Sequence, residues 1–195
     1  MVDNKYKADV VIIGGGLAGI ATALELLDHN KSVLIIDRDK GQRFGGMAND
    51  AFGGMALVDT PVQQRNGIKD SPELALSDWL SAAEFGEQDV WPKAWAKAYC
   101  ERSQKDIYEW LNKRNISFFP IVHWVERGEF KPGNSVPRYH VAWGTGYGVT
   151  QTLIECLKNH SNIDKLRLVF EHRVTDFEFT NGRVSGCRGE NTLGE

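Results

Sequence analysis

Three glycines in the pattern Gly14-x-Gly16-x-x-Gly19 constrain the fold of this chain more than any other feature. They follow a short apolar run, Val10–Ile13, which is typical of a parallel β-strand buried on both faces. They open Leu17–Leu27, where apolar residues recur at helical spacing. In such a strand–turn–helix unit the first glycine permits a tight turn, the second lets a phosphate approach the backbone, and the third allows helix and strand to pack closely.

An acidic residue, Asp37, ends the next strand-like run at residues 32–37, about 20 residues beyond the glycine turn. Because a helix crosses between the two runs, we expect the strands to be parallel neighbours. Asp37 can then accept hydrogen bonds from an adenosine ribose, while the helix N-terminus faces the pyrophosphate. Its charge would repel the 2′-phosphate of NADP. The pattern predicts a dinucleotide site for FAD or NAD.

The stretch after Asp37 favours FAD over NAD. A plain NAD domain would soon continue with another helix and strand, but residues 38–60 are rich in glycine and show no sustained period. Two pairs, Gly45-Gly46 and Gly53-Gly54, leave the chain without side chains where a flat, bulky flavin would lie against it. A flexible surface loop is the alternative. We expect an extended loop with room for a short helix.

The rest of the chain is predicted to alternate helices with strands. Residues 71–85 and 91–114 are predicted as helices, 118–119 as a short strand, 127–137 as a loop, 149–159 as a helix after the glycine-rich 145–148, and 166–170, 174–179 and 183–188 as strands. Asn181-Gly182 is a strong hairpin signal between the last two strands. Ser71 and Pro72 are suited to begin the first of the helices.

Composition limits the partners that the chain can have. Its 195 residues carry a net charge of only −3 without a run of lysine or arginine, so we expect neither nucleic acid nor an anionic membrane surface as partner, but a small molecule. No apolar run approaches the roughly 20 residues of a membrane span. The three cysteines are far apart and the N-terminus is polar, which favours reduced thiols, no metal site and a cytoplasmic location.

Three motifs together resemble a known family. They are Asp9–Gly19, Gly45–Gly54, and Asn134–His140 with Trp143–Gly146. The sequence resembles the FAD-dependent oxidoreductases that include fumarate reductase flavoproteins and 3-ketosteroid dehydrogenases, and is most similar to the branch labelled FAD-binding dehydrogenase. The resemblance implies an α/β fold: a Rossmann-like FAD-binding domain of the glutathione-reductase type, with a parallel sheet and an added β-meander.

The resemblance also extends the predicted site. Residues matching 14–19 and 37 would hold the ADP part of FAD, those matching 45–54 would run past the pyrophosphate and flavin, and the backbone at 174 would meet the adenine. A histidine that tethers flavin covalently in the succinate dehydrogenase relatives is replaced by Met47, which predicts non-covalent FAD. The predicted cofactor-binding residues are Gly14, Gly16, Leu17, Ala18, Gly19, Asp37, Arg38, Gly45, Gly46, Met47, Ala48, Phe52, Gly53, Gly54 and Val174.

Members of the family are considerably longer than this chain. We therefore expect residues 1–195 to be the N-terminal part of an FAD-binding domain, truncated before a capping substrate domain and a C-terminal FAD segment. By resemblance the intact enzyme would dehydrogenate or reduce a carbon–carbon bond beside a carbonyl, in a substrate that is apolar. The catalytic residues stay unknown and the oligomeric state is left open. The alternatives are an NAD-binding dehydrogenase domain and a catalytically silent flavin-binding or interaction module.

Two further groups of residues have alternative roles. Arg138 and His140 either bind an anionic or carbonyl group of a ligand, or Arg138 caps a surface loop and His140 is a half-buried strand residue; the second is favoured. The tryptophans either line an apolar cleft or pack between helices, with packing favoured for most. They are Trp79, Trp91, Trp95, Trp110, Trp124 and Trp143.

Overall fold

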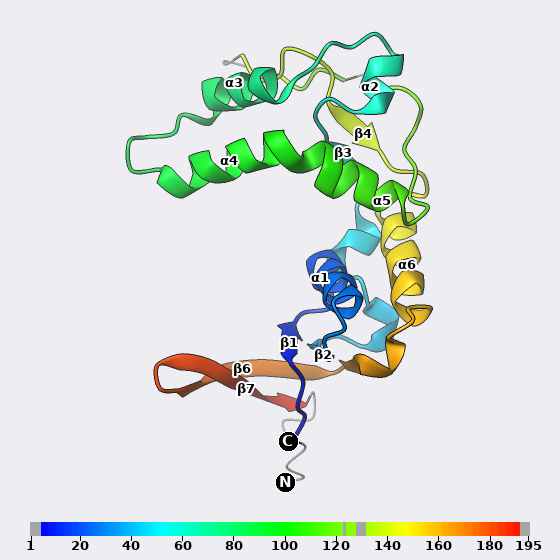
Figure 1. Ribbon diagram of the computed structural model, residues 1–195, viewed down its shortest axis with the longest axis vertical. Helices are drawn as coiled ribbons and strands as arrows, with labels where there is room; N and C mark the ends of the chain where they lie inside the picture. Colours follow the sequence, from blue (N-terminus) through cyan, green and yellow to red (C-terminus); the bar gives the residue numbers. More distant parts are fainter. Residues whose placement is uncertain (1–4, 123, 128–131, 192–195) are drawn as a thin grey trace. The chain divides into compact units, whose positions relative to one another are not determined.

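The computed structural model describes residues 5–122, 124–127 and 132–191. The chain divides into two compact units, one formed by residues 1–50 and 150–195 and the other by residues 51–149 (Figure 1). The division falls inside helix α6, Thr145–Lys158. Each unit has strands and helices of its own.

The first unit contains a three-stranded parallel sheet. Its strands are β1 (Val10–Ile13), β2 (Val33–Ile36) and β5 (Leu166–Val169), in the order β1-β2-β5. Val33 of the central strand is opposite Val10 on one side and Leu166 on the other. The predicted parallel pairing of the first two strands is confirmed, and the third predicted strand joins them although it is distant in sequence.

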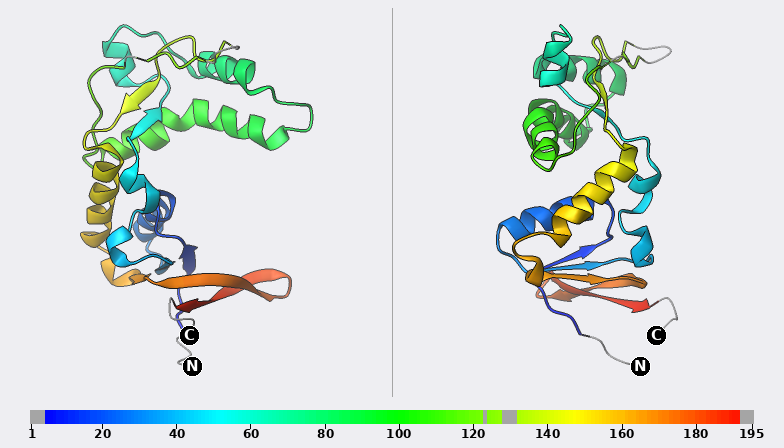
Figure 2. Two further views of the ribbon diagram at one scale, coloured as in Figure 1. Left: turned by 180° about the vertical axis from the view of Figure 1, so that it is seen from behind. Right: turned by 90° about the vertical axis from the view of Figure 1, so that its right-hand side faces the viewer.

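Helix α1 (Leu17–Asp28) connects β1 to β2 and covers the sheet from one side, with α6 crossing beside it (Figure 2). Ile20, Leu24 and Leu27 of α1 are almost fully buried, as are Leu153 and Leu157 of α6. Burial of each such side chain contributes roughly 1.5–3 kcal/mol. This is the core of the unit.

The prediction that β1 is buried on both faces is wrong. Val11 and Ile13 are exposed, and Val10 and Ile12 are only half-buried. β1 is an edge strand of this sheet, and its helix covers one face, so alternate side chains stay uncovered by the described residues. The central strand β2, by contrast, buries Val33, Leu34 and Ile35.

Strands β6 (His172–Thr180) and β7 (Arg183–Asn191) form an antiparallel hairpin in the same unit. The predicted Asn181-Gly182 turn is confirmed, with φ of 52° and 75° at the two positions. Such left-handed values are those of a type I′ turn, which Asn-Gly favours because its twist matches that of the strands. These two strands are the part of the expected meander that the described residues contain.

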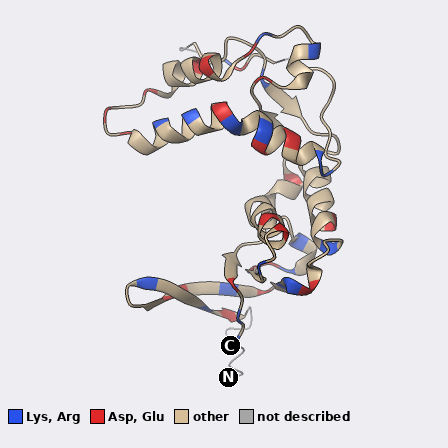
Figure 3. Ribbon diagram, in the orientation of Figure 1, with Lys and Arg blue, Asp and Glu red and all other residues tan. Residues whose placement is uncertain are grey.

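The second unit is mainly helical. Its helices are α2 (Pro61–Arg65), α3 (Pro72–Ala83), α4 (Val90–Ser103), a π-helical stretch η3 (Gln104–Glu109) and α5 (Trp110–Asn112). The last three run on without a break, as the predicted helix over 91–114 requires. The Ser71 hydroxyl accepts a hydrogen bond from the Leu74 N–H at 3.1 Å, so the predicted start of α3 is confirmed. Charged residues of both signs lie along α4 and η3 (Figure 3).

A small antiparallel pair completes this unit: β3 (Gly54–Ala56) pairs with β4 (Tyr139–Val141). The sequence predicts no range for either strand, because three residues are too few for a periodic signal, but the favoured role of His140 as a strand residue agrees with its place in β4. The predicted strand at 118–119 is reduced to a single bridge from Phe118 to Ala142. Of the predicted loop over 127–137, residues 128–131 lie outside the described part of the chain.

The glycine-rich segments adopt more regular structure than expected. Residues 38–60 contain two short 3₁₀ helices, η1 (Gly41–Arg43) and η2 (Gly46–Asp50), besides β3. Helix α6 begins at Thr145 itself, so the predicted glycine turn before the helix is instead its first turn. A further 3₁₀ turn, η4 (Ile163–Lys165), leads into β5. Among the described residues no helix is long and apolar enough to cross a membrane.

Candidate cofactor site and neighbouring cavities

A cleft of about 330 Å³ opens at the carboxyl ends of β1 and β2 in the first unit. This is the edge where ligands bind in open parallel sheets. Six of the predicted cofactor-binding residues line it: Gly14, Asp37, Arg38, Gly46, Met47 and Val174. The structure therefore brings together residues from the glycine turn, the second strand, the glycine-rich segment and the hairpin.

The three motif glycines have different surroundings. A Cβ added to Gly14 or Gly16 would meet no protein atom within 4 Å, so both positions face open space. Gly14 has a φ of 103°, which a side chain would strain. A Cβ at Gly19 would instead collide with the Gly14 carbonyl oxygen. The third glycine permits the packing of α1 on β1, as predicted, while the first two leave a bare backbone surface.

The carboxylate of Asp37 is fixed beside that surface. One oxygen accepts a hydrogen bond from the Gly15 N–H at 2.5 Å, and the other accepts one from the Asp39 N–H at 2.8 Å. A Cβ on Gly15 would come within 2.9 Å of this carboxylate and 2.7 Å of the Phe44 ring. An ionised carboxylate has about four acceptor positions. The two described bonds leave Asp37 able to accept further ones from a ligand.

The segment 45–49 is tied to the glycine turn. The Gly45 N–H donates to the Gly15 carbonyl at 2.9 Å, and Gly45 forms a parallel bridge with Gly16. Asn49 locks η2 by donating to the Phe44 and Gly46 carbonyls at 3.0 and 3.2 Å. Met47 lines the cleft with 87% of its surface exposed. The segment therefore presents backbone and one apolar side chain at the cleft.

Three arginines line the cleft: Arg38, Arg43 and Arg173. Arg43 also pairs with Asp50 at 3.1 Å on the surface. Sequence reasoning missed Arg43 and Arg173, and it missed the other lining residues Ile13, Ile36, Asp39 and His172. A signal existed for Arg173, since it closely follows β5 and the carboxyl ends of parallel strands share one edge.

The other predicted residues lie elsewhere. Leu17, Ala18 and Gly19 form the first turn of α1, and Ala48 lies in η2. Phe52, Gly53 and Gly54 belong to the second unit. There a Cβ on Gly53 would lie 2.6 Å from the Thr145 carbonyl carbon, and one on Gly54 would overlap the Tyr139 hydroxyl. This glycine pair is thus required by packing within its own unit.

Mostly aromatic side chains of the second unit line an open cavity of about 410 Å³. It is lined by Phe52, Phe119, Pro120, Ile121, Trp124, Tyr139, Val141 and Trp143. The Phe119 and Trp143 rings are stacked with centroids 3.8 Å apart. Trp124 lies against Tyr139 with centroids 5.5 Å apart. None of the eight side chains is charged.

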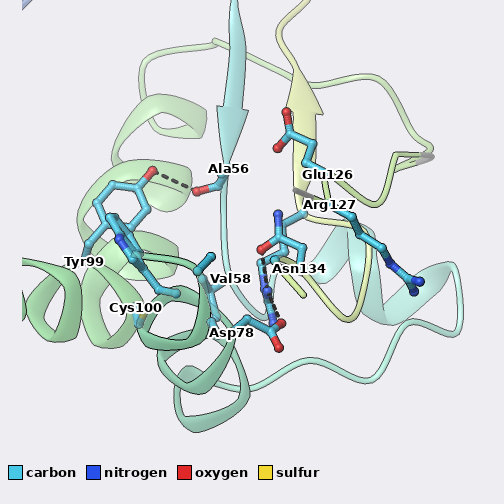
Figure 4. A pocket seen from close by; sticks show the side chains of 13 residues that line it. Ala56, Val58, Asp78, Tyr99, Cys100, Glu126, Arg127 and Asn134 are labelled. Atoms are coloured by element: carbon cyan, nitrogen blue, oxygen red, sulfur yellow. Dashed lines mark hydrogen bonds and ion pairs between the residues drawn. The ribbon is translucent and has the colours of Figure 1, made fainter. Parts of the chain in front are cut away.

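A third cavity, of about 350 Å³, lies in the same unit between α3, α4, β3 and the segment before β4. Figure 4 shows Tyr99 on one wall, with its hydroxyl donating to the Ala56 carbonyl at 2.8 Å, and Asp78 and Asn134 close together on another. Cys100 also lines this cavity, and burial raises the pKa of its thiol. The apolar walls of the third cavity thus meet a group of charged side chains.

Arg138 is the centre of that group. Its guanidinium donates to both carboxylate oxygens of Asp70 at 2.9 and 2.7 Å, and to Asp78 and Asn134 at 2.7 and 2.8 Å. Only 3% of its side chain is exposed, so the prediction that Arg138 caps a surface loop is wrong. Burial lowers the pKa of Arg138, but its bonds to the two carboxylates raise it by more. With its charge compensated by two carboxylates, Arg138 is poorly suited to hold an anionic ligand.

His140 is fully enclosed rather than half-buried, so that expectation is also wrong. Its Nδ1 lies 2.6 Å from the Arg138 carbonyl oxygen, which can only accept, so Nδ1 carries the proton. The Nε2 atom, 2.7 Å from the Thr60 hydroxyl, is then the acceptor. The rings of Tyr108 and Phe118 cover it edge-on. His140 is held as a neutral imidazole.

We expect His140 to make the chain less stable in mild acid. Burial lowers its pKa, although the Arg138 carbonyl and the charge of Asp70 act in the opposite direction. The unfolded chain, with a histidine pKa of about 6.5, then binds more protons as the pH falls below that value, so stability falls with it. His140→Asn keeps a donor for the Arg138 carbonyl and removes the titration. Urea unfolding at pH 7 and 5 should show a smaller loss for His140→Asn; equal losses would contradict the assignment.

The tryptophans are more exposed than the favoured packing role predicts. Trp91 and Trp95 on α4 are 76% and 74% exposed, so packing is wrong for them within the described chain. Trp124 and Trp143 line the aromatic cavity. Trp79 contacts Tyr99 edge-on with ring centroids 5.7 Å apart. The described residues contain no group of three or more His, Cys, Asp or Glu side chains that would hold a metal ion.

The parallel sheet, the glycine turn with open space at Gly14 and Gly16, and the fixed Asp37 carboxylate define a dinucleotide-binding protein. The chain belongs to the FAD binding domain family, whose model matches residues 9–193. Its cofactor is therefore FAD, and the alternative of an NAD-binding domain is not supported.

Curated relatives include two kinds of flavoenzyme. The chain is 40% identical over 186 residues to a KsdD-like steroid dehydrogenase of Mycolicibacterium smegmatis, covering 93% of this chain and 34% of the relative. It is 30% identical over 159 residues to a fumarate reductase (cytochrome) of Shewanella frigidimarina, covering 80% of this chain and 25% of the relative. The chain thus spans about a third or less of the length of these relatives.

A solved structure has the same fold as the chain. The 3-ketosteroid-Δ4-(5α)-dehydrogenase of Rhodococcus jostii RHA1, in complex with 4-androstene-3,17-dione, superimposes with a TM-score of 0.79 and 26% identity, covering all of this chain and 44% of the other. A flavocytochrome c3 fumarate reductase shares the fold with a TM-score of 0.76. The predicted fold class and family are confirmed.

Proposed function

We propose that the cleft of the first unit holds FAD for a flavin-dependent oxidoreductase acting on a carbon–carbon bond beside a carbonyl. The observation that carries the proposal is the bare backbone of the glycine turn: Gly14 lines the cleft, and a Cβ at Gly14 or Gly16 would meet no protein atom within 4 Å. The cofactor supplies hydride acceptance and donation when bound. The relatives, a steroid dehydrogenase and a fumarate reductase, support redox chemistry of this class.

The predicted residues of the first unit each have a place in this proposal. The backbone of Gly14, Gly16 and the first turn of α1, at Leu17, Ala18 and Gly19, receives the pyrophosphate, because the first N–H groups of a helix lack intrahelical partners. Asp37 accepts hydrogen bonds from the ribose, with Arg38 beside it, and the backbone of Val174 meets the adenine. Gly45, Gly46, Met47 and Ala48 follow the flavin side. Phe52, Gly53 and Gly54 belong to the second unit and have no part in this cleft.

The flavin is held without a covalent bond in this proposal. Met47 carries a thioether, which has no ring nitrogen to attach to a flavin methyl group as the histidine of the covalent relatives does. Precipitating the FAD-loaded chain with acid should leave the yellow colour in the supernatant. Colour that stays with the precipitated protein would contradict non-covalent binding.

An apolar small molecule with a carbonyl is the proposed substrate. The aromatic cavity of the second unit is lined by eight uncharged side chains, and one structural relative was solved with a diketone, 4-androstene-3,17-dione. A dicarboxylate such as fumarate would require cationic groups, and the described residues that line the cavity provide none.

The three free cysteines, which form no disulfide in the described chain, support the further proposal of a cytoplasmic location.

Titration of the chain with FAD, followed by the quenching of flavin fluorescence, tests the proposed cleft. We expect saturable binding of FAD that excess NAD does not displace, and weaker binding by Asp37→Asn, which removes the charge that receives the ribose. Asp164→Asn, in η4 and outside the cleft, is the matched control. Displacement by NAD, or equal FAD affinity of Asp37→Asn and the wild type, would contradict the proposed site. The alternative of a catalytically silent module is tested separately on the longer enzyme of which residues 1–195 are the proposed N-terminal part. There, FAD reduced by dithionite should be reoxidised anaerobically by an enone and not by fumarate.

A further inference from the structure

Tyr139 is the residue lining the aromatic cavity of the second unit that carries a hydroxyl group. It lies on β4 opposite Ala56 of β3, so the strand pairing fixes its backbone. Its side chain lies over Gly54 of β3, and its hydroxyl occupies the space that a Cβ of Gly54 would need. Trp124 packs against the other side of the ring. Two strands, a glycine and an indole therefore determine where the hydroxyl lies.

That hydroxyl has no hydrogen-bond partner among the described residues, whereas the hydroxyl of Tyr99 in the third cavity donates to a carbonyl. No fully buried side-chain polar atom of the described chain lacks a partner, so the Tyr139 hydroxyl is in contact with solvent. Buried and half-buried tyrosines generally find a partner for this group. Tyr139 therefore offers an accessible, pre-positioned donor in an otherwise apolar space.

The chemistry of the cavity selects the kind of ligand. Its polar side-chain groups are the Tyr139 hydroxyl and the indole N–H groups of Trp124 and Trp143. All three can donate a hydrogen bond and none carries a charge. Such a set is complementary to an uncharged acceptor, and the stacked Phe119 and Trp143 rings provide an apolar wall for the body of the molecule. A ketone on an apolar ring system fits both requirements.

We propose that the Tyr139 hydroxyl donates a hydrogen bond to the carbonyl oxygen of an apolar cyclic ketone that lies against the Phe119–Trp143 stack. The inference rests on the proposed function, since it names a binding residue for the carbonyl substrate. It assigns to Tyr139 the orientation of the ligand, because the hydroxyl is the donor whose position the β3–β4 pair fixes. The indole groups of Trp124 and Trp143 complete the rim.

Tyr139→Phe is the variant that tests this role. It retains the ring beside Gly54 and its contact with Trp124, and it removes only the hydroxyl. Tyr99→Phe is the matched control, because it removes a hydroxyl from the same unit but from the third cavity. The probe is 4-androstene-3,17-dione, added to the 195-residue chain with and without saturating FAD.

Two measurements separate a binding role from a packing role. Tryptophan fluorescence, to which Trp124 and Trp143 contribute from the cavity, gives the affinity for the probe; we expect Tyr139→Phe to bind about 3- to 10-fold more weakly, the range of one neutral hydrogen bond. Infrared difference spectra should show one carbonyl band of the bound probe at lower frequency in the wild type and in Tyr99→Phe, and unshifted in Tyr139→Phe.

Three outcomes would each overturn the role of Tyr139. They are equal affinity of Tyr139→Phe and the wild type for the probe, an unshifted carbonyl band in the wild type, and no binding of the probe. FAD titration of the same variant is expected to match the wild type, because the proposed FAD cleft lies in the first unit. Failure of FAD to bind the wild type would instead count against the proposed function, so the two failures are distinguishable.

Discussion

Gly16→Ala is expected to keep the fold and lose most of the affinity for FAD. Gly16 precedes α1 with a φ of −78° and a ψ of −177°, values that any residue adopts, and its Cβ would meet no protein atom within 4 Å. The methyl group would therefore occupy only the space proposed for the pyrophosphate. An extra methyl in a fitted contact costs about 1–3 kcal/mol, which corresponds to a roughly 5- to 150-fold loss of affinity.

The stability of Gly16→Ala should change by about 1 kcal/mol or less, because alanine is a poorer N-cap than glycine. Gly16→Ser adds a Cβ while providing a favoured capping residue, so it should lose FAD affinity without that penalty. Thermal unfolding without cofactor, and flavin fluorescence titration with it, measure the two effects independently. Wild-type affinity in both variants would show that the pyrophosphate does not approach Gly16.

Gly19→Ala provides the opposite control within the same motif. Its Cβ would collide with the Gly14 carbonyl oxygen and lie 3.2 Å from the Ile12 side chain, so α1 must shift away from β1. Overpacking of this kind destabilises by about 1–3 kcal/mol. We expect Gly19→Ala to lower the stability of the apoprotein more than Gly16→Ala does. The reverse order would contradict the distinct roles of the two glycines.

The contrast between these glycines indicates what the sequence could predict. The places of Gly14, Gly16 and Asp37 in the fold agree with the sequence prediction, because the turn, the helix start and the strand end are consecutive elements with fixed spacing. The Asn181-Gly182 turn was found for the same reason. Turns and element ends that depend only on consecutive residues can be predicted from the sequence of that segment.

Contacts between distant segments were not predictable in this way. Gly53 and Gly54 were interpreted as making room for a cofactor, but the atoms next to them belong to Thr145 and Tyr139, far along the chain. Nothing in residues 45–54 indicates this, because the glycine requirement arises from the pairing of β3 with β4. One local signal was overlooked: Thr60 and Gln63 form a capping box with Pro61 at the start of α2.

Arg138 shows the same limit, since its partners Asp70 and Asp78 precede it by more than fifty residues. A lone arginine in a proline-bounded segment gives no indication that two carboxylates will surround it. Their identity as buried partners depends on how α3 and the residue Asp70 before it lie against the segment that precedes β4. The favoured surface role failed because burial is a property of the folded unit, not of the local sequence.

Arg138→Met is expected to cause the largest loss of stability of any substitution considered for this chain. It retains most of the apolar volume but removes the guanidinium charge that compensates Asp70 and Asp78, whose side chains are 0% and 12% exposed. Removing one partner of a buried ion pair is destabilising by about 3–5 kcal/mol, because the remaining charge is left without compensation. Urea unfolding followed by circular dichroism gives the free energy of unfolding of each variant.

Two comparisons isolate the buried charge as the cause. Arg43→Met breaks an exposed pair with Asp50, whose side chains are 55% and 66% exposed, and should change stability by about 1 kcal/mol or less. Adding Asp70→Asn and Asp78→Asn to Arg138→Met removes the uncompensated carboxylates, so the triple variant should be more stable than Arg138→Met alone. If Arg138→Met were no more harmful than Arg43→Met, or the triple variant less stable than the single one, the network would not be the electrostatic centre of the second unit.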